Sequence, residues 1–145
     1  MAAFGQQLGI VTQLYAGLIE RLLTPHGVTW PQFTVLVHLA RRSTPARVSD
    51  IAQAVELTQP AVSKIVQKFV LLGLVETGRD LGDQRNRPVH LTPEGRARVG
   101  TIQQGFGPAF GALTQTFAPD DLARLTADLA RLATALTLLR RADSP

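Results

Sequence analysis

Residues 58–73 combine an apolar helical face with polar side chains that can read nucleic acid. Glutamine can pair with adenine, lysine with guanine or phosphate, and serine with either, while alanine or proline can touch a thymine methyl. On an isolated helix the same pattern is more often a solvated face, so the neighbouring elements must decide between the two. The candidate contacts here are Thr58, Gln59, Pro60, Ala61, Ser63, Lys64, Gln67 and Lys68.

A polar, glycine-containing loop at 78–87 adds a second group of candidate contacts. An acid and an arginine two residues apart form, by chance alone, a surface pair worth under about 1 kcal/mol. Cations concentrated in such a loop can also approach phosphates. The candidates in this loop are Arg79, Asp83, Arg85 and Arg87.

No constellation of catalytic residues is found. His26, His38 and His90 form no close pair or H-E-x-x-H motif, and neither G-x-S-x-G nor a P-loop is present. The absence of cysteine excludes a disulfide, a thiol nucleophile and a Cys-type zinc site. Glycines at 105, 107 and 111 miss the dinucleotide fingerprint in spacing and follow no strand. We therefore expect no enzyme, no metal and no cofactor.

The elements that must position the candidate contacts follow from capping signals. Thr29 and Gln32 form a predicted capping box for a helix that runs to about Arg42. Ser49 is the predicted N-cap of a short helix, and Thr58 caps the next, which ends at 72–73. Strands are predicted at 74–77 and 89–91. The second is expected to be an edge strand at Pro88, because proline has no backbone N–H to donate. Two short helices followed by a hairpin predict a mainly α fold with a small β-hairpin wing, a winged helix-turn-helix.

Both ends of the chain predict helices that need a partner. The N-terminal helix carries an apolar stripe with alternating spacings of four and three, which consists of Phe4, Leu8, Val11, Tyr15, Leu18 and Leu22. A helix opening near Pro119 carries a leucine heptad seam. Between them, Thr92 and Pro93 start a helix expected to continue through Phe117, with a kink at 105–108. One small domain cannot cover both stripes, so we expect a homodimer. The predicted dimer contacts are Leu8, Val11, Leu18, Leu122, Leu125, Leu129, Leu132 and Leu136.

Length and charge fit this organisation. The 145 residues fit one domain, with dimerisation helices at about 1–24 and 93–142 and the winged helix at about 29–92. The formal net charge is +4, and residues 41–98 carry the whole surplus because the charges of the two ends cancel. The middle of the chain is therefore expected to meet a polyanion.

The first 19 residues carry no charged side chain, which raises the question of a signal peptide or membrane span. No basic residue precedes Arg21, and polar residues interrupt the apolar run. We expect neither secretion nor a membrane role, and a cytoplasmic protein.

Several motifs together resemble the MarR family of bacterial winged-helix transcriptional regulators, over essentially the whole chain. The most specific lie in the wing, at the spacings of the family's G-L-V, D-x-R and L-T-x-x-G signature, while others match the starts of its second and third helices. Thr77 and Gln84 depart from the pattern, since arginine is common at both positions. The residues that carry the resemblance are Gly73, Leu74, Val75, Asp83, Arg85, Leu91, Thr92, Pro93, Glu94 and Gly95, with Thr29, Pro31, Gln32, Phe33, Ser49, Asp50, Ile51 and Ala52.

The resemblance implies a homodimer whose terminal helices interlock, whose recognition helix enters the major groove and whose wing reaches the minor groove or phosphates. It also implies that Asp83 braces an arginine toward the minor groove. The family binds aromatic or lipophilic effectors between the dimer helices and the DNA-binding lobe. Tyr15, Trp30 and His38 are the polar-tipped candidates for such a site, with plain core packing as the alternative for each.

The leading hypothesis is a sequence-specific regulator that binds double-stranded DNA at a pseudo-palindromic operator, a repressor released by a small molecule. The contrasting hypothesis is a winged-helix protein-interaction module without DNA binding. That module would have no reason to concentrate its net charge at 41–98. A small-molecule carrier or an enzyme ranks third.

Overall fold

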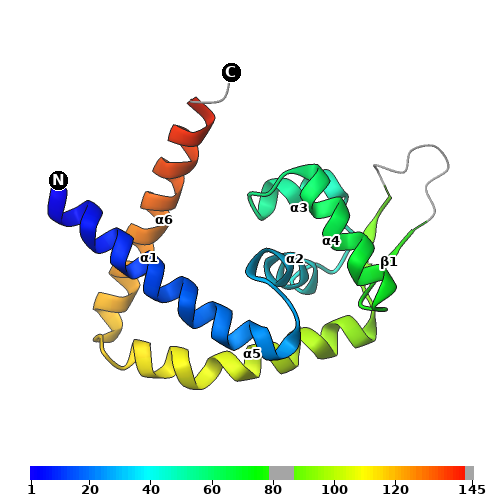
Figure 1. The fold of residues 1–145 in the computed structure, drawn as a ribbon, viewed down its shortest axis with the longest axis horizontal. Coiled ribbons are helices and arrows are strands. Elements are labelled where there is room, and N and C mark those ends of the chain that lie inside the picture. The colour runs from blue at the N-terminus through cyan, green and yellow to red at the C-terminus, as the bar shows by residue number, and fades with distance from the viewer. Residues whose placement is uncertain (79–86, 143–145) are drawn as a thin grey trace. The chain divides into compact units, whose positions relative to one another are not determined.

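The computed structural model describes residues 1–78 and 87–142, and the chain divides into two compact units, Met1–Gly105 and Phe106–Pro145. Three predicted wing contacts, Arg79, Asp83 and Arg85, lie outside the described residues. Figure 1 shows mainly helical elements and one two-stranded antiparallel hairpin, as predicted. The elements are α1 (Ala2–Leu23), the 3-10 helix η1 (Thr24–His26), α2 (Trp30–Ala40), α3 (Val48–Ala54), α4 (Gln59–Leu71), β1 (Val75–Thr77), β2 (Val89–Leu91), α5 (Pro93–Thr114) and α6 (Pro119–Ala142).

Helix α2 begins with the predicted capping box. The Thr29 side chain accepts a hydrogen bond from the Gln32 amide, and the Thr29 amide donates to Gln32 Oε1 at 3.1 Å. Two amides at the helix start are thereby satisfied by side chains only three residues away. The helix ends at Ala40, two residues before the predicted end at Arg42.

The prediction that Ser49 caps α3 is wrong. The helix begins at Val48 with Arg47 at the N-cap, and Ser49 lies in its first turn. The reason is a β-bridge just upstream, in which the Ala46 amide donates to Val89 O at 2.9 Å and the Val89 amide donates to Ala46 O at 2.8 Å. This isolated bridge gives Val89 a second neighbour, while β2 is an edge strand of the two-stranded sheet, as Pro88 suggested.

Helix α4 and the hairpin follow the predicted order. Thr58 accepts from the Ala61 amide as the N-cap, and Gly73 ends the helix region at a φ of 70°, which favours glycine. Strand β1 begins one residue later than predicted, because the Leu74 amide donates to Phe69 O at the helix end. It pairs with β2 in the register Val75↔Leu91, Glu76↔His90, Thr77↔Val89.

The core of the first unit lies among α2, α3, α4 and the hairpin. Helix α2 packs against β2, α3 against α4, and α4 against β1. The largest fully buried side chains come from all of these elements, from Leu23 of α1 and from Ile102 of α5: Phe69, Leu23, Leu36, Ile51, Leu74, Ile102, Val35, Val62, Val75 and Val89.

The apolar stripe predicted along α1 is not the face that packs into this core. The buried residues of α1 are Ile19 and Leu23, one turn apart and absent from the predicted stripe. Phe4 and Val11 of the stripe are 60% and 57% exposed. Leu8, Leu18 and Leu22 of the stripe are half-buried. The fully buried residues of α1 therefore lie in its C-terminal turn, and the N-terminal part of the stripe is largely exposed in the single chain.

Helix α5 runs without a break from Pro93 to Thr114 and contains Pro108. The expectation that it continues through Phe117 is wrong, since Phe117 lies in the turn before α6. In the second unit the rings of Phe106 and Phe110 stack at 5.6 Å. Helix α6 opens at Pro119 as predicted, and none of its side chains is buried.

Among the described residues, every helix is too short or too polar to cross a bilayer.

Candidate nucleic-acid interface and apolar pocket

Helix α4 presents two different faces. Val62, Ile65, Val66 and Phe69 are buried in the core. Among the predicted contacts, Ala61, Ser63 and Lys68 are half-buried and the others are exposed: Thr58, Gln59, Pro60, Lys64 and Gln67. The buried face fixes the rotation of the helix, so the polar face is held toward solvent.

A groove of about 490 Å³ joins α4 to the hairpin. Ser63 and Gln67 of α4 line it together with Thr77 of β1 and Arg87, which lies next to β2. The structure thus brings predicted contacts of the helix and of the wing onto one surface. The described residues that line it are Val48, Ser63, Val66, Gln67, Val70, Leu71, Thr77, Arg87 and Val89.

Lys68 differs from the other predicted contacts on α4. Its Nζ donates to Gln32 Oε1 at 3.0 Å and to the carbonyl oxygen of Gly27 at 3.4 Å. The ammonium group therefore ties α4 to the start of α2. Contact between Lys68 and DNA stays a prediction, while Lys64, one turn earlier, is exposed.

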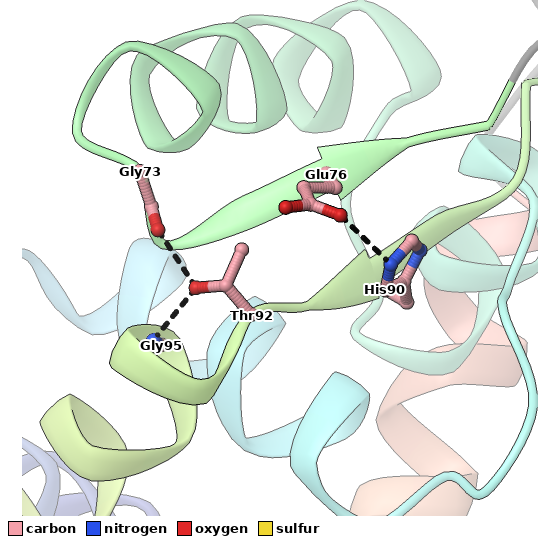
Figure 2. Close-up of polar contacts among 5 residues, drawn as sticks. All are labelled: Gly73, Glu76, His90, Thr92 and Gly95. Carbon is pink, nitrogen blue, oxygen red and sulfur yellow. Dashed lines mark hydrogen bonds and ion pairs between the residues drawn. The ribbon is translucent and has the colours of Figure 1, made fainter.

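The base of the hairpin is held by a short polar network, shown in Figure 2. Thr92 Oγ1 donates to Gly73 O at 2.7 Å and accepts from the Gly95 amide at 3.0 Å. One hydroxyl thus joins the end of α4 to the start of α5. Across the two strands, His90 Nε2 lies 3.3 Å from Glu76 Oε2. Both contacts fix the strands that carry the wing.

A second pocket of about 490 Å³ lies between α1 and the start of α2. Two predicted effector residues, Tyr15 and Trp30, meet there with ring centroids 6.2 Å apart in an edge-on arrangement. Burial raises the pKa of the Tyr15 phenol, so the phenol is neutral at pH 7. The lining is Thr12, Tyr15, Ala16, Ile19, Glu20, Leu23, Thr24, Val28, Thr29 and Trp30.

His38, the third predicted effector residue, is not part of this lining. Its Nε2 is buried and has no hydrogen-bond partner in the described part of the chain. Burial lowers the pKa of His38, the charges of Arg42 and Arg41 lower it further, and Asp50 opposes them. The imidazole is therefore neutral at pH 7.

The comparison with known sequences bears on the segment that carries these contacts. The sequence model of the MarR family matches residues 26–86, which include α2, α3, α4 and β1. Over these residues the chain is similar to the MarR family. No curated protein sequence matches the chain.

Solved structures share the MarR-family fold over nearly the whole chain. Wild-type MarR from E. coli, in its apo form, is 25% identical over 88% of this chain and 95% of that one, with a TM-score of 0.69. Staphylococcus aureus MarR in complex with salicylate and kanamycin is 17% identical over 94% and 91%, with a TM-score of 0.82. The S. aureus MepR–DNA complex is 19% identical over 91% and 97%, with a TM-score of 0.78.

The structure gives a physical reason for each glycine and for the threonine that carry the MarR resemblance at the base of the hairpin. Gly73 needs its positive φ, and Thr92 makes the bridge at the hairpin base. At Gly95 an added Cβ would lie 2.0 Å from Leu74 O, which leaves room only for hydrogen. These residues support the wing rather than any ligand.

Sequence reasoning missed most of the lining of the pocket at Tyr15 and Trp30. Tyr15 was singled out, whereas Thr12, Ala16 and Ile19 of the same helix were not. A signal was available, because these positions and Glu20 fall at helical spacings of three, one, three and one. That face of α1 borders the predicted apolar stripe. Only the stripe, and not this neighbouring face, was predicted from the sequence.

Proposed function

We propose that this chain is a dimeric transcriptional regulator that binds double-stranded DNA and acts as a repressor released by a small molecule. The single observation that carries the proposal is the surface where Ser63 and Gln67 of α4 meet Arg87 of the wing. That surface lies within residues 41–98, which hold the whole positive surplus of the chain. A polyanion is its natural partner.

The two parts of this surface have different tasks. Gln59, Lys64 and Gln67 are exposed on α4 and can reach base edges in the major groove. Arg87 is a candidate for a phosphate contact, which positions the protein without reading sequence. The similar fold of S. aureus MepR in its DNA complex supports DNA binding by this chain.

The uncovered apolar faces support a homodimer. Leu129 and Leu136 of the α6 seam are each 51% exposed. Residues 1–24 and 93–142 would supply the dimer contacts, and two copies related by a twofold axis would bind a pseudo-palindromic operator. We propose a cytoplasmic location, because a regulator of this kind must reach chromosomal DNA.

The pocket at Tyr15 and Trp30 is the proposed effector site. Its volume of about 490 Å³ suits a small molecule. Thr29 lines it, pairs with Gln32 in the capping box, and Gln32 in turn accepts from Lys68 of α4. Rearrangement of the pocket lining can therefore reach the DNA-binding helix through two hydrogen bonds.

Fluorescence anisotropy against DNA from upstream of the protein's own gene tests the proposal. Gln59→Ala should weaken binding to the preferred site by about 1–3 kcal/mol and relax base preference. Arg87→Ala should instead weaken all sequences alike and flatten the salt dependence. Equal binding of all DNA by the wild type and both variants would contradict the proposal.

One observation favours the alternative of a winged-helix protein-interaction module. Val70, Leu71 and Leu72 at the end of α4 are 42%, 88% and 57% exposed, which is a run of apolar side chains facing solvent. In that case Leu71→Ser would abolish the interaction, and no DNA fragment would bind at physiological salt. Charge placement favours DNA, so this function stands second.

A further inference from the structure

The lining of the Tyr15–Trp30 pocket has an uneven charge. Among the described residues, Glu20 is the only formally charged side chain of the lining, and none of the lining residues is a lysine, arginine or histidine. Within residues 1–78 and 87–142, Glu20 forms no ion pair with a side chain. No side-chain ion pair among these residues therefore compensates its negative charge.

The remaining lining is apolar or aromatic. Ile19, Leu23 and Val28 are buried and close the inner wall, while Tyr15 and Trp30 are partly exposed. Aromatic rings have a negative face that attracts cations, most strongly in tryptophan. Because the Tyr15 phenol is neutral at pH 7, it can offer this ring and a hydroxyl without adding charge.

We propose that this pocket binds an aromatic cation, with Glu20 as its counter-charge and the Tyr15 and Trp30 rings as its platform. The inference rests on the proposed function of the pocket as the effector site. A flat, positively charged ligand would bury its rings against apolar side chains and keep its charge beside Glu20. Salicylate, found with S. aureus MarR, is an anion and meets no cationic side chain in this lining.

Direct binding without DNA tests the ligand class. The full-length protein is titrated with a quaternary phenanthridinium dye, with uncharged phenanthridine at pH 8 and with salicylate, and binding is followed by fluorescence and calorimetry. The wild type should bind the cation at least tenfold more tightly than salicylate, and added salt should weaken cation binding.

Glu20→Gln preserves the side-chain shape and removes the charge. It should weaken cation binding about tenfold and leave phenanthridine binding unchanged. The matched control Glu94→Gln changes an exposed acid in the first turn of α5, outside the lining, and should leave all three affinities unchanged. Melting curves by circular dichroism verify that both variants fold.

Equal cation affinity in wild type and Glu20→Gln would overturn the proposal, as would preference for salicylate or failure of all three probes to bind. DNA release is measured separately. Glu20-dependent cation binding without DNA release would support the ligand class and contradict effector release. Release of DNA by salicylate, independent of Glu20, would support effector release and contradict the proposed ligand class.

Discussion

Lys68 on α4 donates a hydrogen bond to Gln32 on α2, with 3.0 Å between Nζ and Oε1. The same Gln32 oxygen accepts from the Thr29 amide at 3.1 Å. One side-chain oxygen thus serves the cap of α2 and the ammonium group of the proposed recognition helix. Lys68 consequently helps to hold α4 against α2, although its position in the sequence suggested only a DNA contact.

Substitutions of the two lysines of α4 should have different effects, one mainly on stability and the other mainly on DNA binding. Lys68→Met should lower the free energy of unfolding by about 1–2 kcal/mol, because a charge-assisted hydrogen bond between helices is lost. Lys64→Met, at an exposed position one turn away, should change stability by less than about 0.5 kcal/mol and weaken DNA binding. Urea denaturation and anisotropy measure the two effects. Equal stability of both variants would show that the Lys68 contact contributes nothing to the fold.

Gly95 should tolerate no side chain. In Gly95→Ala the new Cβ would lie 2.0 Å from Leu74 O and 2.9 Å from Leu91 Cδ2, so the hairpin base must shift. We expect a loss of more than about 3 kcal/mol in unfolding free energy, comparable with severe core overpacking. Gly100→Ala on the same helix meets open space and should gain up to about 1 kcal/mol. Equal melting temperatures for the two variants would contradict this difference.

The features that could be predicted from sequence depend on partners close along the chain. Thr29 with Gln32, Thr58 with Ala61 and Thr92 with Gly95 each join residues three apart. A cap of this kind is encoded in a four-residue window, so the starts of α2, α4 and α5 were predictable.

The features that could not be predicted depend on distant partners. Ser49 has the right residue type for a cap, yet the bridge between Ala46 and Val89 sets where the extended chain ends and α3 begins. Lys68 reaches Gln32 across 36 positions. The grouping of His38 with Tyr15 and Trp30 rests on its polar tip and on the expectation that their helices meet, yet His38 does not line the pocket. Only the three-dimensional packing decides such contacts.

The half-buried imidazole of His38, whose Nε2 atom is buried, should make stability depend on pH. Its pKa is lowered from 6.5 by burial, then by Arg42 and Arg41, so the unfolded chain takes up this proton at a higher pH than the folded chain. Stability from this residue is therefore present above pH 6.5 and is lost as the pH falls below that value. His38→Met should remove this slope between about pH 7 and 5, measured by urea denaturation.

Arg41→Gln provides the control for the His38 prediction. Removing one of the cations that lower the imidazole pKa should reduce the slope without abolishing it, because burial is the larger cause. An identical pH dependence in wild type and His38→Met would assign the acid sensitivity to other groups.

The exposed leucine seam of α6 should hold the dimer together. The wild type should sediment at twice the chain mass of 15.7 kDa. Leu136→Asp places a charge on the 51% exposed seam and should give monomer or aggregate. Ala127→Asp introduces the same charge on the opposite face of α6, where it should leave the dimer intact. A folded wild-type monomer at micromolar concentration would contradict the dimer proposal.

The glycines at 105 and 107 test whether bending of α5 couples effector to DNA. The division between the two compact units falls between Gly105 and Phe106, and Pro108 removes one helical hydrogen bond just beyond it. Added Cβ atoms at Gly105 and Gly107 would meet nothing within 4 Å, so these glycines are not required for close packing within the chain. Alanine at both should stiffen the helix and raise stability by up to about 1 kcal/mol each.

On this basis Gly105→Ala with Gly107→Ala should keep the dimer, raise the melting temperature, and change DNA affinity or the effector response. Gly100→Ala with Gly111→Ala is the matched control, because it makes the same two exchanges in open positions of α5 outside 105–108. A tenfold change in DNA affinity corresponds to about 1.4 kcal/mol of coupling, well within the range that stiffening one helix can supply. If both double variants bind DNA and respond to ligand as the wild type does, bending at 105–108 has no part in release. The path from Thr29 through Gln32 to Lys68 would then have to carry the coupling alone.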